Sequence, residues 1–187
     1  MKGCVFLKTF LLSGVHGVGK GFFLKKVENR IDNYIILSAS NLIGKYKCAT
    51  DAGYKKVTHV NKNQDVLISA LNQEQSIAKQ DIILDGHICI FNAAGLIERI
   101  PKYFFIDGQI VGIIILQDSE NEILKRINQR DSQTINIEDI IKMQVEERKY
   151  AEEIEEKYLI KHKIISHECS AEQFEMVLKE LGGDIVE

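Results

Sequence analysis

The chain has 187 residues, a length typical of one domain with a sizeable core. Hydrophobic residues make up 45% and charged residues 27%, which excludes a disordered or fibrous protein. The formal net charge of -3 excludes a general electrostatic attraction to nucleic acid or to an anionic membrane. We therefore expect a single domain over residues 1–187 that binds small-molecule substrates, with no nucleic-acid and no membrane partner.

The cysteines and the start of the chain give no sign of a metal centre, an export signal or a membrane anchor. The cysteines form no C-x-x-C pair, so no zinc or redox site is indicated: they are Cys4, Cys48, Cys89 and Cys169. The segment Met1–Lys8 lacks the long apolar core of a signal peptide, and no apolar run approaches ~18 residues. We expect a cytoplasmic protein.

A glycine-rich loop follows the first predicted strand. The apolar run Phe10–Leu12 predicts a buried strand, and the pattern over Phe22–Val27 predicts a helix. The loop between them fits G-x-x-x-x-G-K, with Gly14, Gly19 and Lys20 in register. Strand, glycine loop, lysine and helix in this order are the context of a phosphate-binding loop, or P-loop.

The composition of this loop suits the binding of a polyphosphate. Backbone N–H groups at the positive end of a helix must converge on the phosphates, and glycines remove side chains that would block them. The ammonium group of Lys20 then supplies charge for the outer phosphates during phosphoryl transfer. A tight glycine turn with a solvated lysine is the alternative. We expect ATP to bind to Gly14, His16, Gly17, Val18, Gly19, Lys20, Gly21 and Phe22.

Gly21 distinguishes this loop from most P-loops, in which Ser or Thr follows the lysine and its hydroxyl binds Mg²⁺. The sequence Gly-x-x-Gly-x-Gly-Lys-Gly resembles the loop of adenylate kinase-like nucleoside monophosphate kinases, in which glycine stands after the lysine. Those enzymes usually carry Pro where this chain has His16 and Thr where it has Phe22. Because a phenyl ring cannot donate a hydrogen bond to phosphate, one contact of that family is expected to be missing.

The second predicted strand is Tyr34–Leu37, and Ser40 or Asn41 is suited to cap a helix after it. In the adenylate kinase-like family this helix covers the acceptor nucleotide and carries an arginine that holds its phosphate. Gly44 stands at the place of that arginine, with Lys45 beside it. The resemblance implies that Ser40 and Lys45 contact the acceptor, whereas a plain surface helix is the alternative.

A carboxylate follows the third predicted strand. The spacing of apolar residues predicts a helix over Gln64–Lys79 and then a strand over Asp81–Leu84. Asp85 ends this strand, where it can hold Mg²⁺ directly or through water beside the P-loop. The Asp-Gly pair is similar to the magnesium-side aspartate of the family, and Asp-x-His also occurs in its archaeal-type adenylate and cytidylate kinase-like branch. A simple Asp-Gly turn is the alternative.

His87 is a candidate for contact with the acceptor phosphate, and core packing is the alternative. Adenylate kinases carry an arginine a few residues after the Asp-Gly pair, whereas Ile88–Phe91 contains none. Cys89 and Gly44 therefore occupy the places of the two arginines that hold the acceptor phosphate in that family.

The next predicted strand, Ile110–Leu116, is almost wholly apolar, as parallel sheets buried on both faces require. The helix after it carries Arg126 and Arg130, which share a face because they are four residues apart. Arginines there resemble the short lid of the family, placed around 126–136, which closes over ATP and stabilises charge on the transferring group. A solvated charged face is the alternative.

The chain ends in a long acidic helix, a short strand and a last helix. The long helix covers Ile137–Tyr158, and related kinases have an arginine at the place of Arg148 that points back to the phosphates. Lys163–Ile165 is the last predicted strand, and the last helix begins at Ser170. The alternation of strands and helices predicts an α/β fold, a three-layer α/β/α sandwich with a five-stranded parallel sheet.

The motifs and the resemblance together imply the P-loop NTPase fold of nucleotide kinases. We expect a kinase that uses ATP and Mg²⁺ and transfers the γ-phosphoryl group to a nucleoside monophosphate, with Lys20, Arg126, Arg130 and Arg148 as catalytic residues. Two alternatives remain. One is a slow ATPase or nucleotide-dependent binding module that acts on a protein partner, and the other is a kinase for the hydroxyl of a small metabolite, with Asp85 as its base.

Overall fold

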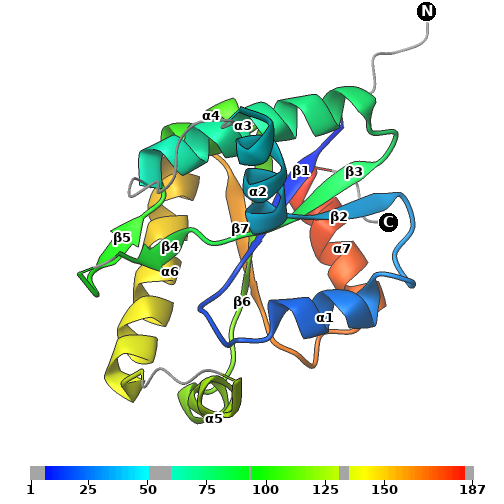
Figure 1. Cartoon of the computed structure of the whole chain (residues 1–187). Helices are drawn as coiled ribbons and strands as arrows, with labels where there is room; N and C mark the ends of the chain where they lie inside the picture. Colours follow the sequence, from blue (N-terminus) through cyan, green and yellow to red (C-terminus); the bar gives the residue numbers. More distant parts are fainter. Residues whose placement is uncertain (1–6, 51–59, 93, 131–134, 184–187) are drawn as a thin grey trace, which may run out of the picture.

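Five strands form one parallel sheet with β1 in its centre (Figure 1). The computed structural model describes residues 7–50, 60–92, 94–130 and 135–183, without the side chains of residues 47–50, 60–62 and 130. The spatial order is β2-β3-β1-β6-β7, from β1 (Thr9–Ser13), β2 (Tyr34–Ser38), β3 (Asp81–Asp85), β6 (Ile110–Leu116) and β7 (Lys161–Ile165). The predicted five-stranded parallel sheet is confirmed.

Helices cover both faces of this sheet, which completes the predicted three layers. They are α1 (Lys20–Val27), α2 (Ala39–Thr50), α3 (Val60–Ile77), α4 (Tyr103–Asp107), α5 (Glu120–Arg130), α6 (Ile137–Tyr158) and α7 (Ala171–Leu181). α1 and α7 contact each other on one side, and α4 and α6 pack on β6 from the other (Figure 1). Because β1 and β6 are covered on both faces, every residue of β1 is buried, and β6 is an apolar run.

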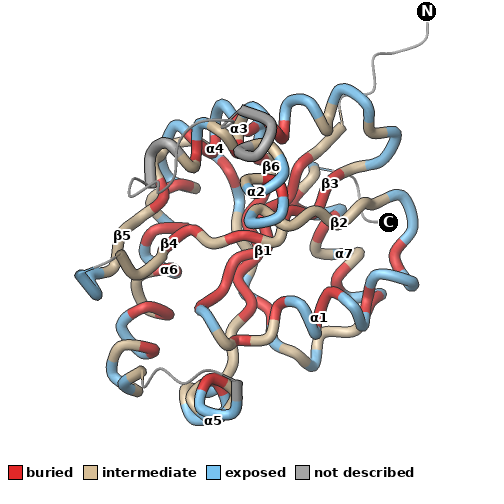
Figure 2. Tube along the Cα trace, in the orientation of Figure 1, coloured by how far each residue is buried: buried red, intermediate tan, exposed pale blue. Residues whose placement is uncertain are grey.

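The register of the strands brings the predicted site segments to one edge of the sheet. Leu12 of β1 pairs with Asp85 of β3 on one side and with Ile114 of β6 on the other. The loops that follow these three strands therefore leave the sheet at the same level, next to its buried centre, which is red in Figure 2. This edge, at the carboxyl ends of parallel strands, is where open α/β sheets bind their ligands.

Several predicted boundaries differ from the structure in small ways. α2 begins at Ala39, and the hydroxyl of Ser38, in place of Ser40 or Asn41, accepts the hydrogen bond from the first turn, at 3.5 Å. α3 begins at Val60, four residues before the predicted start at Gln64. A tertiary contact or a cap moves such boundaries by a few residues without changing the type of element.

A small two-stranded antiparallel sheet is a feature that the sequence patterns did not predict. It consists of β4 (Cys89–Phe91) and β5 (Ile97–Arg99), each only three residues long. A run of three residues is too short to show a reliable alternation of apolar and polar side chains. No helix in the described part of the chain is both long and apolar enough to span a membrane.

Candidate functional site

The glycine loop has the backbone shape that its sequence predicts. Gly17 has φ 82° and Gly19 has φ 96°, in the left-handed region that favours glycine. A Cβ atom at Gly17 would lie 2.4 Å from Ile127 Cγ1, and one at Gly19 would lie 2.9 Å from His167 Cε1. Since α1 begins at the next residue, Lys20, the loop presents the N-terminus of a helix to the edge of the sheet.

The side chain of Lys20 lies beside the loop that follows β3. It is only 8% exposed, and its Nζ donates a hydrogen bond of 3.1 Å to the carbonyl oxygen of Gly14. Nζ also lies 3.3 Å from His87 Nε2 and 3.8 Å from Asp85 Oδ1. Lys20 of the P-loop is thus brought together with Asp85 and His87 of the loop that follows β3.

The burial of these groups shifts their pKa values. Burial lowers the pKa of Lys20, and the neighbouring carboxylate of Asp85 opposes this shift. Burial and the nearby ammonium of Lys20 lower the pKa of His87 to about 3. Burial raises the pKa of Asp85 against the pull of Lys20. His87 is therefore a neutral imidazole at physiological pH, which can accept a hydrogen bond from the ammonium group.

A second carboxylate, Glu147 of α6, lies behind the P-loop and was missed by the sequence reasoning. Its side chain is fully buried, and its Oε1 accepts a hydrogen bond of 2.7 Å from Ser13 Oγ. Burial raises its pKa to about 7, while the Ser13 hydroxyl and the charge of Lys20 oppose that shift. The available signal was helical spacing, since Glu147 lies in register with the buried residues Ile140, Met143, Tyr150, Ala151 and Ile154.

Arg126 of α5 also contacts the P-loop. Its Nη1 donates a hydrogen bond of 3.0 Å to the carbonyl oxygen of Val18, and its Nη2 lies 2.5 Å from Asp118 Oδ2. His167, which follows β7, contacts the same carbonyl through its Nε2. Asp118 and His167 are therefore further residues of this site that the sequence did not single out.

No contact of the other two predicted catalytic arginines with the P-loop is described. Arg148 is exposed, one position after the buried Glu147 on α6. The side chain of Arg130 lies outside the described residues, as do residues 131–134 of the expected lid. Arg126 is thus the lid arginine whose contact with the loop is described.

A cavity of about 610 Å³ opens at this edge of the sheet. One half is formed by the P-loop and by the groups that face it, which are His16, Gly17, Gly19, Lys20, Gly21, Phe22, Asp85, His87 and Arg126. The other half extends toward α2 and α3 and is lined by Ser38, Ala39, Ser40, Ile43, Asn63, Gln64, Leu67, Ile100 and Phe104. The cavity is continuous from the phosphate loop to the expected place of the acceptor.

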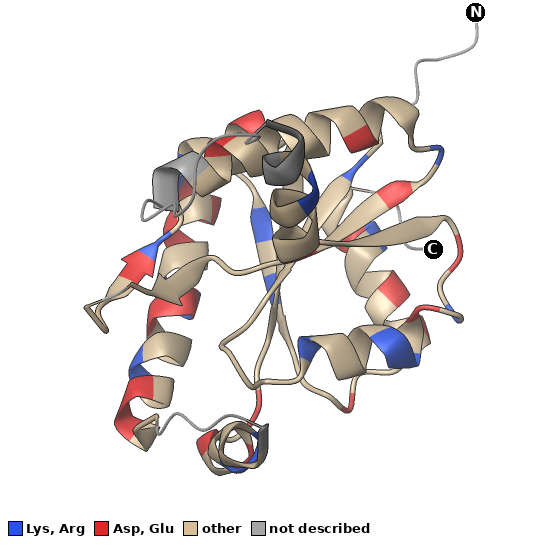
Figure 3. Cartoon of the chain, in the orientation of Figure 1, with Lys and Arg blue, Asp and Glu red and all other residues tan. Residues whose placement is uncertain are grey.

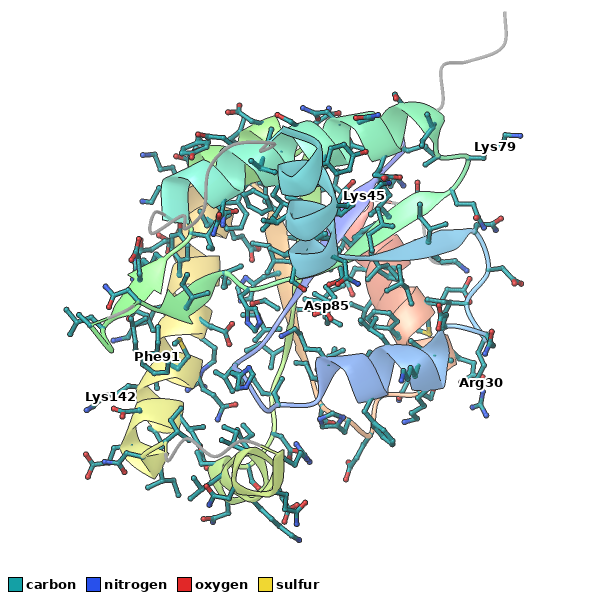
Figure 4. The ribbon with its side chains drawn as sticks, in the orientation of Figure 1. Arg30, Lys45, Lys79, Asp85, Phe91 and Lys142 are labelled. Atoms are coloured by element: carbon teal, nitrogen blue, oxygen red, sulfur yellow. The ribbon has the colours of Figure 1, made fainter. Side chains whose placement is uncertain are left out.

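The predicted acceptor-binding residues have different positions. Ser40 and His87 line the cavity. Lys45 lies on α2, where its Nζ contacts Glu74 Oε1 of α3 at 2.9 Å. Lys45 can be found in Figure 4, which also labels Asp85 of the phosphate site. Phe22 is 74% exposed at the rim of the cavity. The structure therefore gives Ser40 and His87 access to a ligand and gives Lys45 a partner on the neighbouring helix.

Asp85 is the residue best placed to hold a magnesium ion. Its half-buried carboxylate lines the cavity beside Lys20, and Gly21 offers no side-chain ligand. Among the described residues, no three His, Cys, Asp or Glu side chains form a group that could enclose a metal. One carboxylate, water and nucleotide phosphates are a usual ligand set for Mg²⁺, so these residues fit the ion.

The sequence matches one known family, and the fold matches solved structures. The profile of a family described as an AAA domain matches residues 13–144. The tunicamycin resistance protein of Deinococcus radiodurans has a TM-score of 0.63 and 14% identity, over 96% of this chain and 97% of its own. A gluconokinase from Sinorhizobium meliloti 1021 has a TM-score of 0.49 and 9% identity, over 95% and 93%. At 14% identity, the match with the Deinococcus radiodurans protein shows likeness of fold alone. No curated protein matches the chain.

Proposed function

The chain belongs to the AAA domain family and has a P-loop kinase-like fold, and from this premise we propose that it transfers the γ-phosphoryl group of MgATP to a small acceptor molecule. The observation that carries the proposal is the position of Lys20. Its buried ammonium group lies at the N-terminus of α1, with Asp85 and His87 beside it in the cavity. Phosphate oxygens are the natural replacement for the carbonyl and carboxylate oxygens that surround Nζ.

Each group at the P-loop has a role in this proposal. The backbone of the loop and Lys20 hold the β- and γ-phosphates, and Asp85 holds Mg²⁺, which neutralises developing charge on the transferring group. Arg126 exchanges the carbonyl of Val18 for nucleotide oxygen when ATP binds. Arg130 and Arg148 remain candidates for the closed state, because lid segments move when substrate binds.

A nucleoside monophosphate is the first candidate acceptor. The resemblance of the P-loop to that of adenylate kinase-like enzymes supports it, as does the continuous cavity past Ser40 and His87. An acceptor phosphate is already a nucleophilic anion, so no general base is required. The acceptor oxygen would form a bond to the γ-phosphorus while the bridging oxygen leaves with ADP.

A hydroxyl of a small metabolite is the second candidate, and the lining of the cavity favours it. Among the described residues that line the cavity, Lys20 and Arg126 are the cations, and both lie at the P-loop. The far half offers neutral polar groups, such as those of Asn63 and Gln64, together with apolar side chains. In this reaction Asp85 would take the hydroxyl proton as the new oxygen–phosphorus bond forms.

An acceptor screen tests the proposal. ADP formation would be followed with each nucleoside monophosphate, with neutral polyhydroxy compounds and with no acceptor, and phosphorylated products would be identified by mass spectrometry. We expect an acceptor to raise ADP formation above the rate without acceptor. Because few cations hold a phosphate in the described cavity, we also expect poor selectivity and substantial hydrolysis of ATP by water.

Two results would contradict parts of the proposal. A rate of ADP formation that no acceptor raises, with ATP still bound, would support a slow ATPase or a nucleotide-dependent binding module. A single tightly used nucleoside monophosphate with negligible hydrolysis would exclude the hydroxyl acceptor. It would also show that the acceptor phosphate is held by groups other than Ser40 and His87.

A further inference from the structure

Glu147 is a charged residue at a place where the helix pattern calls for an apolar one. It lies in the middle of α6, and neighbours on the same helix face, Met143 and Tyr150, are buried with it. Acidic residues recur along α6 (Figure 3), but the side chain of Glu147 is 0% exposed. A carboxylate is rarely fully buried in a protein unless it has a specific partner.

One partner of Glu147 is Ser13, the last residue of β1, and the backbone amide of Gly14 also lowers the pKa of this carboxylate as a hydrogen-bond donor. Ser13 Oγ donates to Glu147 Oε1 at 2.7 Å, and the same Oγ accepts a hydrogen bond of 3.0 Å from the backbone amide of Ile88. Ser13 is also 0% exposed, so this chain of hydrogen bonds is shielded from water. One hydroxyl therefore connects α6, the start of the P-loop and the loop that follows β3.

Two residues of this chain, Ser13 and Ile88, are next to residues that contact Lys20. Ser13 precedes Gly14, whose carbonyl oxygen accepts a hydrogen bond of 3.1 Å from Lys20 Nζ. Ile88 follows His87, whose Nε2 lies 3.3 Å from the same Nζ. The hydrogen bond from Ile88 to Ser13 therefore joins the two loops close to Lys20, in addition to the bond of 3.0 Å from the Gly86 amide to the carbonyl oxygen of Leu12.

We propose that Glu147 is a positioning residue of the phosphate site, which acts through Ser13 to hold the P-loop and the Asp85–Ile88 loop at the spacing that Lys20 requires. This inference rests on the proposed phosphotransfer function, and it adds to that function a residue on α6. Because α6 follows the expected lid in sequence, the same hydrogen bonds connect the helix after the lid to the P-loop. The charge of Glu147 also acts on Lys20 in the same direction as that of Asp85.

The test separates positioning from stability by two substitutions at one position. Glu147→Met keeps the length of the side chain and suits the apolar surroundings, but it removes the acceptor for Ser13. Replacement of a buried charge by an apolar residue of similar volume is often neutral or stabilising. Glu147→Gln keeps an acceptor oxygen for Ser13. Its amide NH₂ takes the place of Glu147 Oε2, which has no hydrogen-bond partner among the described residues.

We expect Glu147→Met to lower kcat by about tenfold, because the free energy of one buried hydrogen bond corresponds to about this change in rate. The change in KM for ATP should be smaller. Glu147→Gln should restore most of the rate. Ser13→Ala should cause a similar loss, and the double variant Ser13→Ala with Glu147→Met should lose little more than either single variant. Glu152→Gln, an exposed change on the same helix, is the control and should behave as the wild type.

A second measurement does not depend on activity. In Glu147→Met, we expect faster hydrogen exchange of the backbone amide of Ile88, measured by NMR, at unchanged global stability. If the wild type transfers no phosphoryl group, the proposed function fails, but this exchange still tests the role of Glu147. Wild-type kcat and wild-type exchange at Ile88 in a folded Glu147→Met variant would overturn the inference.

Discussion

Lys20 Nζ and Asp85 Oδ1 lie 3.8 Å apart at the carboxyl edge of the sheet, although the two residues are 65 positions apart in the sequence. The pairing of β1 with β3 makes this possible, because it aligns Leu12 with Asp85. The ammonium that is suited to phosphate and the carboxylate that is suited to Mg²⁺ therefore face one cavity. This arrangement gives the protein the two charges that a phosphoryl-transfer site needs.

Asp85→Asn is expected to raise the concentration of Mg²⁺ needed for half-maximal activity and to lower kcat by roughly tenfold or more. An amide oxygen is a weaker ligand for Mg²⁺ than an ionised carboxylate, and it cannot accept a proton from a hydroxyl acceptor. A Mg²⁺ titration of the rate measures both effects. Asp107→Asn, an exposed change at the end of α4, is the control. An unchanged Mg²⁺ requirement in Asp85→Asn would remove this residue from the metal site.

Arg126→Ala is expected to lower kcat by at least about tenfold and to change KM for ATP less, because a lid arginine contacts the transferring group best in the closed site. The neighbouring Lys125 is exposed, so Lys125→Ala is a matched control. Steady-state kinetics at saturating acceptor would compare the two variants. Equal rates in both would place Arg126 outside the reaction.

Arg148→Ala provides a separate test of the lid. Arg148 is exposed and lies away from the described contacts of the P-loop, so we expect a smaller loss of rate than in Arg126→Ala. A loss as large as that of Arg126→Ala would mean that α6 or the lid changes position when substrates bind.

Gly19→Ala and Gly21→Ala are expected to have opposite effects on stability. At Gly19 the φ of 96° and the nearby ring of His167 oppose a Cβ atom, so we expect a loss of about 1–2 kcal/mol and weaker ATP binding. At Gly21, inside α1, a Cβ would contact nothing within 4 Å, so a gain of about 0.5–1 kcal/mol is expected. Chemical denaturation measures both, and a stabilising Gly19→Ala would contradict the loop geometry.

Much of the fold and part of the site were predictable from the sequence because their signals are local. The strands that carry the P-loop and Asp85 are apolar runs with clear ends, and α6 has the predicted bounds Ile137–Tyr158. The P-loop is also local, since its glycines and its lysine are consecutive with the strand and the helix. Both strand ends could therefore be assigned to one edge of a parallel sheet without coordinates.

Glu147 could not be assigned in this way, because its role depends on a contact across 134 positions with Ser13. The sequence reasoning favoured Arg148 on the same helix. Helical spacing could have placed Glu147 on the buried face of α6, but it could not have identified Ser13 as its partner. Asp118 and His167 were missed for the same reason, since only packing brings them to the P-loop beside Arg126. Long-range contacts of this kind leave no pattern in a single sequence.

His87 is expected to make the protein less stable in acid. Its pKa is lowered to about 3 in the fold, against an ordinary value near 6.5, because of burial and the charge of Lys20. The unfolded chain therefore binds the proton more tightly, and the free energy of unfolding falls as the pH drops from 6.5 toward 3. For this group alone the loss between pH 7.5 and pH 5 is about 2 kcal/mol.

Urea denaturation of the wild type and of His87→Gln at pH 7.5 and pH 5 measures this effect. The two proteins share all other titrating groups, including His16, whose charge also faces the imidazole. The stability of His87→Gln should therefore depend less steeply on pH than that of the wild type. Parallel changes in the two proteins would show that His87 titrates normally.

The binding of MgATP to the wild type and to Lys20→Ala, measured by isothermal titration calorimetry, tests the central claim most directly. We expect the loss of this charge-assisted contact, roughly 1.5–3 kcal/mol, to weaken binding about tenfold to a hundredfold. Lys25→Ala, an exposed change in the same helix, should bind MgATP as the wild type does. Equal affinity of the wild type and a correctly folded Lys20→Ala would contradict the assignment of this loop as the nucleotide site.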